Sequence, residues 1–173
     1  MRRWIVAVIA ASALLGGCAK EVSPQAVAEP TRWDPCSITP EQIGATGLDP
    51  DYREVGWGRG IEVPDWDICS FKPEGRNVPY YFVVKSSSNR TVGEARGDSS
   101  NFAGRNFELD GRDAFQYQTK ASNAVDSCSV AVEAAPGVVV LSVNAFTADG
   151  GVDPCSVLLG HVDDLKSALP RDK

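Results

Sequence analysis

The chain has 173 residues, of which 43% are hydrophobic and 23% are charged, so it can bury one compact core and is neither a disordered nor a fibrous protein. Its 17 basic and 23 acidic side chains give a net charge of −6. This balance argues against nucleic-acid binding, because nucleic-acid-binding proteins concentrate positive charge on one surface. We therefore expect a single acidic domain.

The first residues have the pattern of an export signal. Arg2 and Arg3 precede an uncharged apolar stretch over residues 4–15, which is shorter than the roughly 20 residues that span a bilayer. The stretch ends in Leu15-Gly16-Gly17-Cys18, which resembles the lipobox of bacterial lipoproteins. The resemblance implies that residues 1–17 are a signal peptide and that Cys18 carries the lipid, palmitate included, that holds the protein at the extracytoplasmic face of the cell membrane. An ordinary secretory signal is the alternative.

Residues 18–33 follow as the lipidated cysteine and a tether. They mix proline, alanine and polar residues without periodicity, which is typical of an extended and flexible linker. We expect the folded domain to occupy residues 34–170.

Four cysteines remain in this domain: Cys36, Cys69, Cys128 and Cys155. An even number in an exported protein predicts two disulfides, and no CxxC spacing indicates a metal or redox site. Three pairings are possible. We favour Cys36–Cys69 and Cys128–Cys155, because residues 34–37 and 153–156 are the same tetrapeptide, each before a helical pattern, and each would then be joined to a β-type run.

The chain between and around these cysteines alternates helix and strand signals. Thr39-Pro40 predicts a short capped helix, and residues 91–102 have helical spacing interrupted by glycines. A third helix, with an apolar stripe that ends at Leu169, precedes Pro170. Three hairpins are expected, with their strands at residues 68–72 and 80–86, 107–109 and 114–119, and 127–134 and 138–146. The predicted fold is α+β, an antiparallel sheet flanked by N- and C-terminal helices.

Several of these motifs occur together in one known family. They are Asp34-Pro35-Cys36, Thr39-Pro40-Glu41, Cys69-Ser70-Phe71, Asp110-Gly111-Arg112-Asp113-Ala114, Cys128-Ser129-Val130-Ala131-Val132, and Cys155 through Leu169-Pro170. In this order the chain resembles the domain-of-unknown-function 3558 family, exported lipoproteins of actinobacteria. The resemblance implies an envelope location and two disulfides, and it supplies no catalytic residues. By analogy with other lipoproteins of such envelopes, a PsbP/Mog1-like α/β/α sandwich is the expected topology.

The sequence offers little catalytic chemistry. His161 is the only histidine, and it borders the apolar stripe of the last helix, where we expect it to be a packing residue. No nucleophile elbow, metalloprotease, phosphate-loop or dinucleotide motif occurs in the sequence. We therefore expect no cofactor, no metal and no catalytic set.

One long segment, residues 49–67, has the composition of a recognition loop. It carries Tyr52, Trp57 and Trp66 among glycines and acidic residues, and large aromatic side chains favour interfaces. The alternative is that these rings cover the edge of the core. The favoured function is a non-enzymatic envelope module that binds a protein or a small apolar ligand through this loop or a cleft beside the sheet. The second hypothesis is an envelope hydrolase that uses carboxylate residues.

Overall fold

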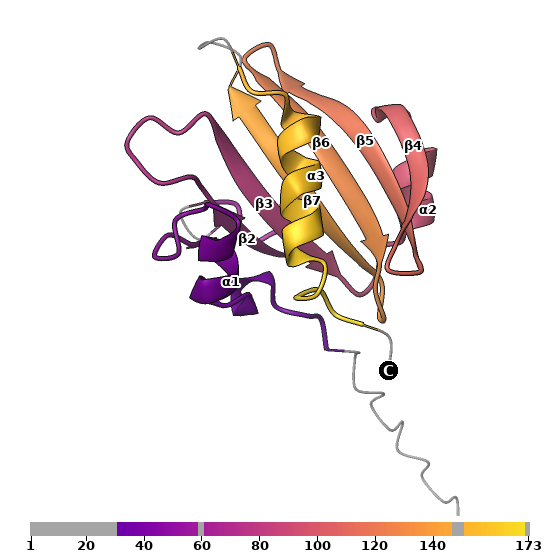
Figure 1. The fold of residues 1–173 in the computed structure, drawn as a ribbon. Coiled ribbons are helices and arrows are strands. Elements are labelled where there is room, and N and C mark those ends of the chain that lie inside the picture. Colours follow the sequence, from indigo (N-terminus) through magenta and orange to yellow (C-terminus); the bar gives the residue numbers. More distant parts are fainter. Residues whose placement is uncertain (1–30, 59–60, 147–150, 172–173) are drawn as a thin grey trace, which may run out of the picture.

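A computed structural model describes residues 31–58, 61–146 and 151–171 of the chain. These residues form one seven-stranded antiparallel sheet in the order β1-β2-β3-β7-β6-β5-β4, with helices against it (Figure 1). The strands are β1 (Glu54–Val55), β2 (Asp67–Phe71), β3 (Tyr80–Ser87), β4 (Phe102–Leu109), β5 (Arg112–Ser122), β6 (Val125–Glu133) and β7 (Val138–Phe146).

Four helical segments accompany the sheet: the 3₁₀ helix η1 (Pro35–Ser37), α1 (Pro40–Ala45), α2 (Val92–Gly97) and α3 (Pro154–Leu165). The repeated tetrapeptide begins η1 and α3 in the same way. The carboxylate of Asp34 accepts a hydrogen bond from the Cys36 N–H at 2.8 Å, and that of Asp153 accepts one from the Cys155 N–H at 3.0 Å. Local capping by the same side chain thus explains why the same four residues start both helices.

The main core lies on one face of the sheet, under α3 and beside α1 (Figure 1). Alternate residues of the central strands point to this face, as the two-residue period of a strand requires. They pack against the apolar stripe of α3, which is buried at Leu158, Val162 and Leu165. The centre of this face consists of large apolar side chains, among them Phe71, Phe82, Val84, Val130, Val132, Leu141 and Val143.

Both disulfides are present in the pairing that the repeated tetrapeptide favours. Cys36–Cys69 joins η1 to β2, and Cys128–Cys155 joins β6 to the first turn of α3. Each disulfide therefore fastens a helical segment to the sheet.

The opposite face of the sheet carries the two-turn helix α2. Val92 and Ala95 of this helix pack on Phe115, Tyr117 and other residues that point away from the main core. Because α2 has only six residues, it covers the β5 and β6 part of this face and leaves the rest without a helix.

The predicted α+β class is confirmed, and the structure changes several boundaries. The strands around Asp110-Gly111 are longer than predicted and run over β4 and β5, while the two turn residues have φ values of 51° and 76°, as a tight hairpin turn needs. The helix predicted over residues 91–102 ends at Gly97, because Asp98 is already extended. The last helix ends at Leu165, although its predicted apolar stripe extends to Leu169, and Leu169 is buried outside the helix.

The predicted signal peptide and Cys18 lie outside the described residues, as does most of the predicted tether. Its last residues contact the domain: Arg32 pairs with Asp67 at 3.1 Å, and the carbonyl oxygen of Trp33 accepts a hydrogen bond from the Ser86 hydroxyl. Trp33 also packs against the main core, so the folded part begins slightly before the predicted boundary at residue 34. In the described ranges, no helix is long and apolar enough to cross a membrane.

Candidate functional site

A cleft of about 530 Å³ lies on the face of the sheet that carries α2. Its floor is formed by strands β3, β7, β6 and β5, and α2 forms one wall. The other wall is the segment that we call the tryptophan loop, residues 56–58 and 61–66, which contributes Trp57 and Trp66. The volume falls in the range of small-molecule binding sites.

The floor is built from small and polar side chains in cross-strand rows. One row runs Val83, Ser142, Ser129 and Tyr117 across the four strands. The hydroxyl groups of Ser129 and Ser142 lie 2.8 Å apart and are hydrogen-bonded, and both residues are buried. These side chains alternate with large core residues, which is why the two faces of the same strands differ so strongly.

The two tryptophans occupy the cleft differently. Trp57 is 60% exposed and stands at the rim, whereas Trp66 is partly buried and packs against the cluster beneath α2. The backbone N–H of Trp57 donates to the carbonyl oxygen of Ile61 at 2.9 Å, and the backbone N–H of Trp66 donates to the carbonyl oxygen of Val63 at 3.1 Å. Backbone hydrogen bonds within the described part of the loop therefore hold both residues at the cleft.

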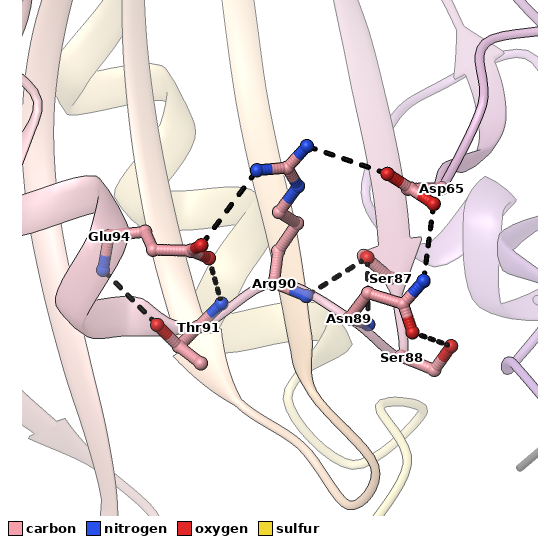
Figure 2. A network of polar contacts seen from close by, with 7 residues as sticks. All are labelled: Asp65, Ser87, Ser88, Asn89, Arg90, Thr91 and Glu94. Carbon is pink, nitrogen blue, oxygen red and sulfur yellow. Dashed lines mark hydrogen bonds and ion pairs between the residues drawn. The ribbon is translucent and has the colours of Figure 1, made fainter.

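Arg90 joins the two walls at one end of the cleft, as Figure 2 shows. Its guanidinium lies 3.4 Å from the carboxylate of Asp65 in the tryptophan loop and 3.8 Å from that of Glu94 in α2. The backbone N–H of Arg90 donates to the Ser87 hydroxyl at 3.2 Å, and the carboxylate of Glu94 also accepts a hydrogen bond from the backbone N–H of Thr91 at 2.8 Å. The positive charge of Arg90 is thus already paired.

Lys85 is the other basic residue of the cleft. Its ammonium nitrogen lies 5.4 Å from the ring centre of Trp66 and 6.0 Å from that of Trp57, within the range of cation–π attraction. Over the described residues, Lys85 Nζ makes neither a hydrogen bond nor an ion pair. Burial lowers the pKa of Lys85, because desolvation disfavours its charged form.

A second cavity of about 300 Å³ continues the cleft past Trp57, and we call it the extension. The cleft and the extension share Trp57, Val83, Val125 and Asn144 as lining residues. Beyond these shared residues, the extension is lined by Tyr81 and Phe146, whose rings meet edge-on at a centroid distance of 6.0 Å, and by Glu54, Gly56, Gly58 and Ser70. The extension is therefore more aromatic than the floor beside Lys85.

Tyr52 lies apart from Trp57 and Trp66. It is not among the residues that line the cleft or the extension, and its ring packs beside Tyr81 and under the ammonium group of Lys72. Burial, together with a hydrogen bond from its hydroxyl to Glu54, raises the pKa of Tyr52 to about 12. The structure therefore brings two of the three predicted contact residues together.

His161 lies on α3, on the opposite face of the sheet from the cleft. Its side chain is 5% exposed, and its ring centre is 4.9 Å from that of Phe82 in the main core. This is the packing position that the sequence predicts for it.

The carboxylates of the cleft, Glu94 and Asp98, are both exposed. Hydrogen bonds from the backbone and the hydroxyl of Ser100 lower the pKa of Asp98. A general acid needs the opposite shift. Within the described ranges, no group of three or more histidine, cysteine or acidic side chains is placed to hold a metal ion.

Sequence reasoning did not identify the residues of the floor. Lys85, Ser142 and Tyr117 come from three different strands, and only the sheet brings them to one surface. A signal was nevertheless present, since Ser127 and Ser129 in one strand and Ser142 and Asn144 in the next alternate with core residues.

Two comparisons with known proteins gave no match, neither among curated proteins nor among solved structures. The PsbP/Mog1-like topology therefore stays a prediction. A family model described as "protein of unknown function (DUF3558)" matches residues 13–165, which is most of the chain and includes all four disulfide cysteines. The chain belongs to the DUF3558 family.

Proposed function

We propose that this protein is an exported, lipid-anchored module of the cell envelope, of actinobacterial type, that binds a small apolar ligand in the cleft without catalysing a reaction. The observation that carries the proposal is the placement of Trp57 and Trp66 over a cleft in the face of the sheet that lacks a full helical cover. A pocket with aromatic walls and a few polar groups is the usual form of a small-molecule site.

The location rests on the N-terminal sequence. Two arginines, an apolar stretch and a cysteine after two glycines are the features on which lipoprotein processing depends, and the family match begins at residue 13, ahead of Cys18. A lipid on Cys18 would keep the cleft near the membrane surface, where apolar envelope molecules are concentrated.

The rim of the cleft supports an apolar ligand. Trp57, which lines both the cleft and the extension, is 60% exposed. An exposed aromatic side chain that borders two adjoining cavities is placed to contact an apolar ligand, and small-molecule sites are lined mostly by apolar and aromatic side chains. This rim also fits the protein partner that the sequence leaves open, which the experiment below can distinguish.

The hydrolase hypothesis has less support. A carboxylate hydrolase needs two carboxyl groups across the bond to be broken, one of them with a raised pKa. The pKa of Asp98 is shifted the wrong way, and Glu94 is held by Arg90 and by the backbone of Thr91. The aromatic side chains of the cleft therefore support binding, whereas its carboxylates do not support hydrolysis.

Photo-crosslinking tests the proposal on the full-length protein in lipid nanodiscs. The probe is decanol bearing a diazirine, a neutral apolar molecule, and the crosslinked peptides are identified by mass spectrometry. We expect saturable labelling of peptides from the tryptophan loop, β3 and β7. Trp57→Ala should weaken labelling with an unchanged melting temperature, because its side chain is mostly exposed. Loss of an aromatic anchor often costs about 2 kcal/mol, or about thirtyfold in affinity.

The matched control is Leu159→Ala, since Leu159 is an exposed apolar residue of α3, on the far face of the sheet. It should leave labelling unchanged. If Trp57→Ala lowers the melting temperature and leaves labelling unchanged, the loop is a packing element and the proposal fails. If decanol labels no cleft peptide while a purified envelope protein protects the loop from modification, the ligand is a protein instead.

A further inference from the structure

Lys85 differs from the other charged side chains of the cleft in having neither an ion pair nor a hydrogen bond among the described residues. Arg90 is paired with Asp65 and Glu94, and Asp98 accepts two hydrogen bonds from Ser100. The ammonium group of Lys85 has instead two indole rings within 6.0 Å. Those rings shield it from water and attract its charge, but they do not neutralise it.

Lys85 also has a defined position relative to the extension. Lys85, Val83 and Tyr81 lie on the same face of β3, because side chains alternate along a strand. Four residues of strand span about 13 Å. A ligand lying along β3 would thus meet a cation at one end, then Trp57, and then the aromatic extension formed by Tyr81 and Phe146.

We propose that the cleft takes a single-chain anionic amphiphile, whose carboxylate or phosphate pairs with Lys85 Nζ while its apolar chain lies past Trp57 in the extension. This inference rests on the proposed function and specifies the ligand class. It assigns separate roles to the two cavities: the cleft beside Lys85 binds the charged head, and the extension binds the chain.

The geometry favours one anionic group. Among the described lining residues, Lys85 and Arg90 are the basic ones, and Arg90 already has two carboxylate partners. A peptide with several acidic side chains would therefore find one available cation, in a protein whose net charge is −6. An amphiphile with one anionic head group needs one cation, which Lys85 can supply.

The polar floor complements an anionic oxygen group. The hydroxyls of Ser129 and Ser142 lie in the row next to the one that holds Lys85 and Val140. A hydroxyl can donate as well as accept, so the hydrogen-bonded pair has one proton that can be turned towards a ligand oxygen. An ion pair beside the indole rings of Trp57 and Trp66 is less screened than one at the open surface, which strengthens its attraction.

The test compares two diazirine probes of equal chain length, decanoate and decanol, on the full-length protein in lipid nanodiscs. We expect Lys85→Met to raise the half-saturating concentration of the decanoate probe at least about tenfold and to leave that of the decanol probe within about twofold. The control is Lys120→Met, because Lys120 is exposed and lies on the other face of the sheet. Competition by unlabelled dodecanoate and dodecyl phosphate shows which head group the site prefers.

The outcomes separate this inference from the proposed function. If both probes bind equally and Lys85→Met changes neither, the proposal of an anionic ligand fails, and the proposed function, binding of an apolar ligand, still stands. Failure of both probes to label cleft peptides overturns the proposed function as well. Competition by an acidic peptide but by neither amphiphile would overturn the inference in favour of a protein ligand. The decanol arm and the melting temperature of Lys85→Met show whether the variant is folded.

Discussion

The hydroxyl of Tyr80 lies 3.0 Å from Nε2 of His161 and joins β3 to α3 on the face of the sheet opposite the cleft. The imidazole is buried against Phe82, and burial lowers its pKa, although the charge of nearby Asp164 acts in the opposite direction. His161 therefore belongs to the packing of α3 on the sheet, and its protonation is coupled to the stability of that packing.

The first prediction concerns the pH dependence of stability. Because the pKa of His161 in the folded protein is below its ordinary value of 6.5, the unfolded chain binds more protons between the two values. The free energy of unfolding should rise with pH through this interval and be fully restored above 6.5. Urea unfolding at several pH values should show this slope, and His161→Gln should reduce it.

The slope of a second variant controls for the carboxylates. The pKa of Asp113 is lowered by its hydrogen-bonded ion pair with Arg96, so its contribution to the free energy of unfolding is lost only at more acidic pH. Asp113→Asn should therefore leave the slope near neutral pH unchanged. An unaltered slope in His161→Gln would show that another group is responsible.

The second prediction concerns Gly137, in the turn between β6 and β7. It has a φ of +90°, and a Cβ atom there would collide with the backbone of Ser87 at the end of β3. Gly137→Ala should therefore lower the free energy of unfolding by more than the roughly 1–2 kcal/mol that a left-handed conformation costs on its own. Thermal or denaturant unfolding measures the difference.

Gly111→Ala is the matched control. Gly111 has a φ of +76° with open space around its Cβ position, so this variant bears the backbone cost without the collision. Equal destabilisation of the two variants would mean that Ser87 moves aside without cost.

Much of the architecture could be predicted because its signals are local. The capped helix expected at Thr39-Pro40 is α1, where Thr39 and Gln42 form a capping box, and Asp110-Gly111 forms the turn expected between β4 and β5. The disulfide pairing was predicted from a repeated tetrapeptide, and both copies cap the start of a helix with an aspartate side chain. In each case the residues that determine the structure are within a few positions of the element they start or end.

The cleft could not be predicted in the same way, because its residues are close only after the strands pair. Lys85 and Val140 are far apart in sequence and meet as partners of β3 and β7. The aromatic composition of residues 49–67 did indicate Trp57 and Trp66, but Tyr52 shares that composition and lies elsewhere. Composition identifies candidate contact residues, whereas strand order decides which of them face the same space.

The third prediction concerns the Cys128–Cys155 disulfide, which closes a separation of 27 residues. Replacing both cysteines by serine should lower the free energy of unfolding by about 3–4 kcal/mol, because the unfolded chain regains the entropy that the crosslink removes. Peptide mapping without reduction should recover Cys128 linked to Cys155 and Cys36 linked to Cys69. A peptide pair joining Cys36 to Cys155 would contradict this connectivity.

The last prediction concerns the membrane anchor. If Cys18 carries the lipid, Cys18→Ala should move the protein from the membrane pellet to the soluble fraction, because each buried CH₂ group of an acyl chain contributes about 0.8 kcal/mol of membrane affinity. The control is Cys36→Ser, which breaks a disulfide inside the domain and should leave the protein in the pellet. Mass spectrometry of the mature N-terminus identifies the attached lipid directly. Retention of Cys18→Ala in the pellet would show that another segment, such as the uncleaved apolar stretch before Cys18, holds the protein at the membrane.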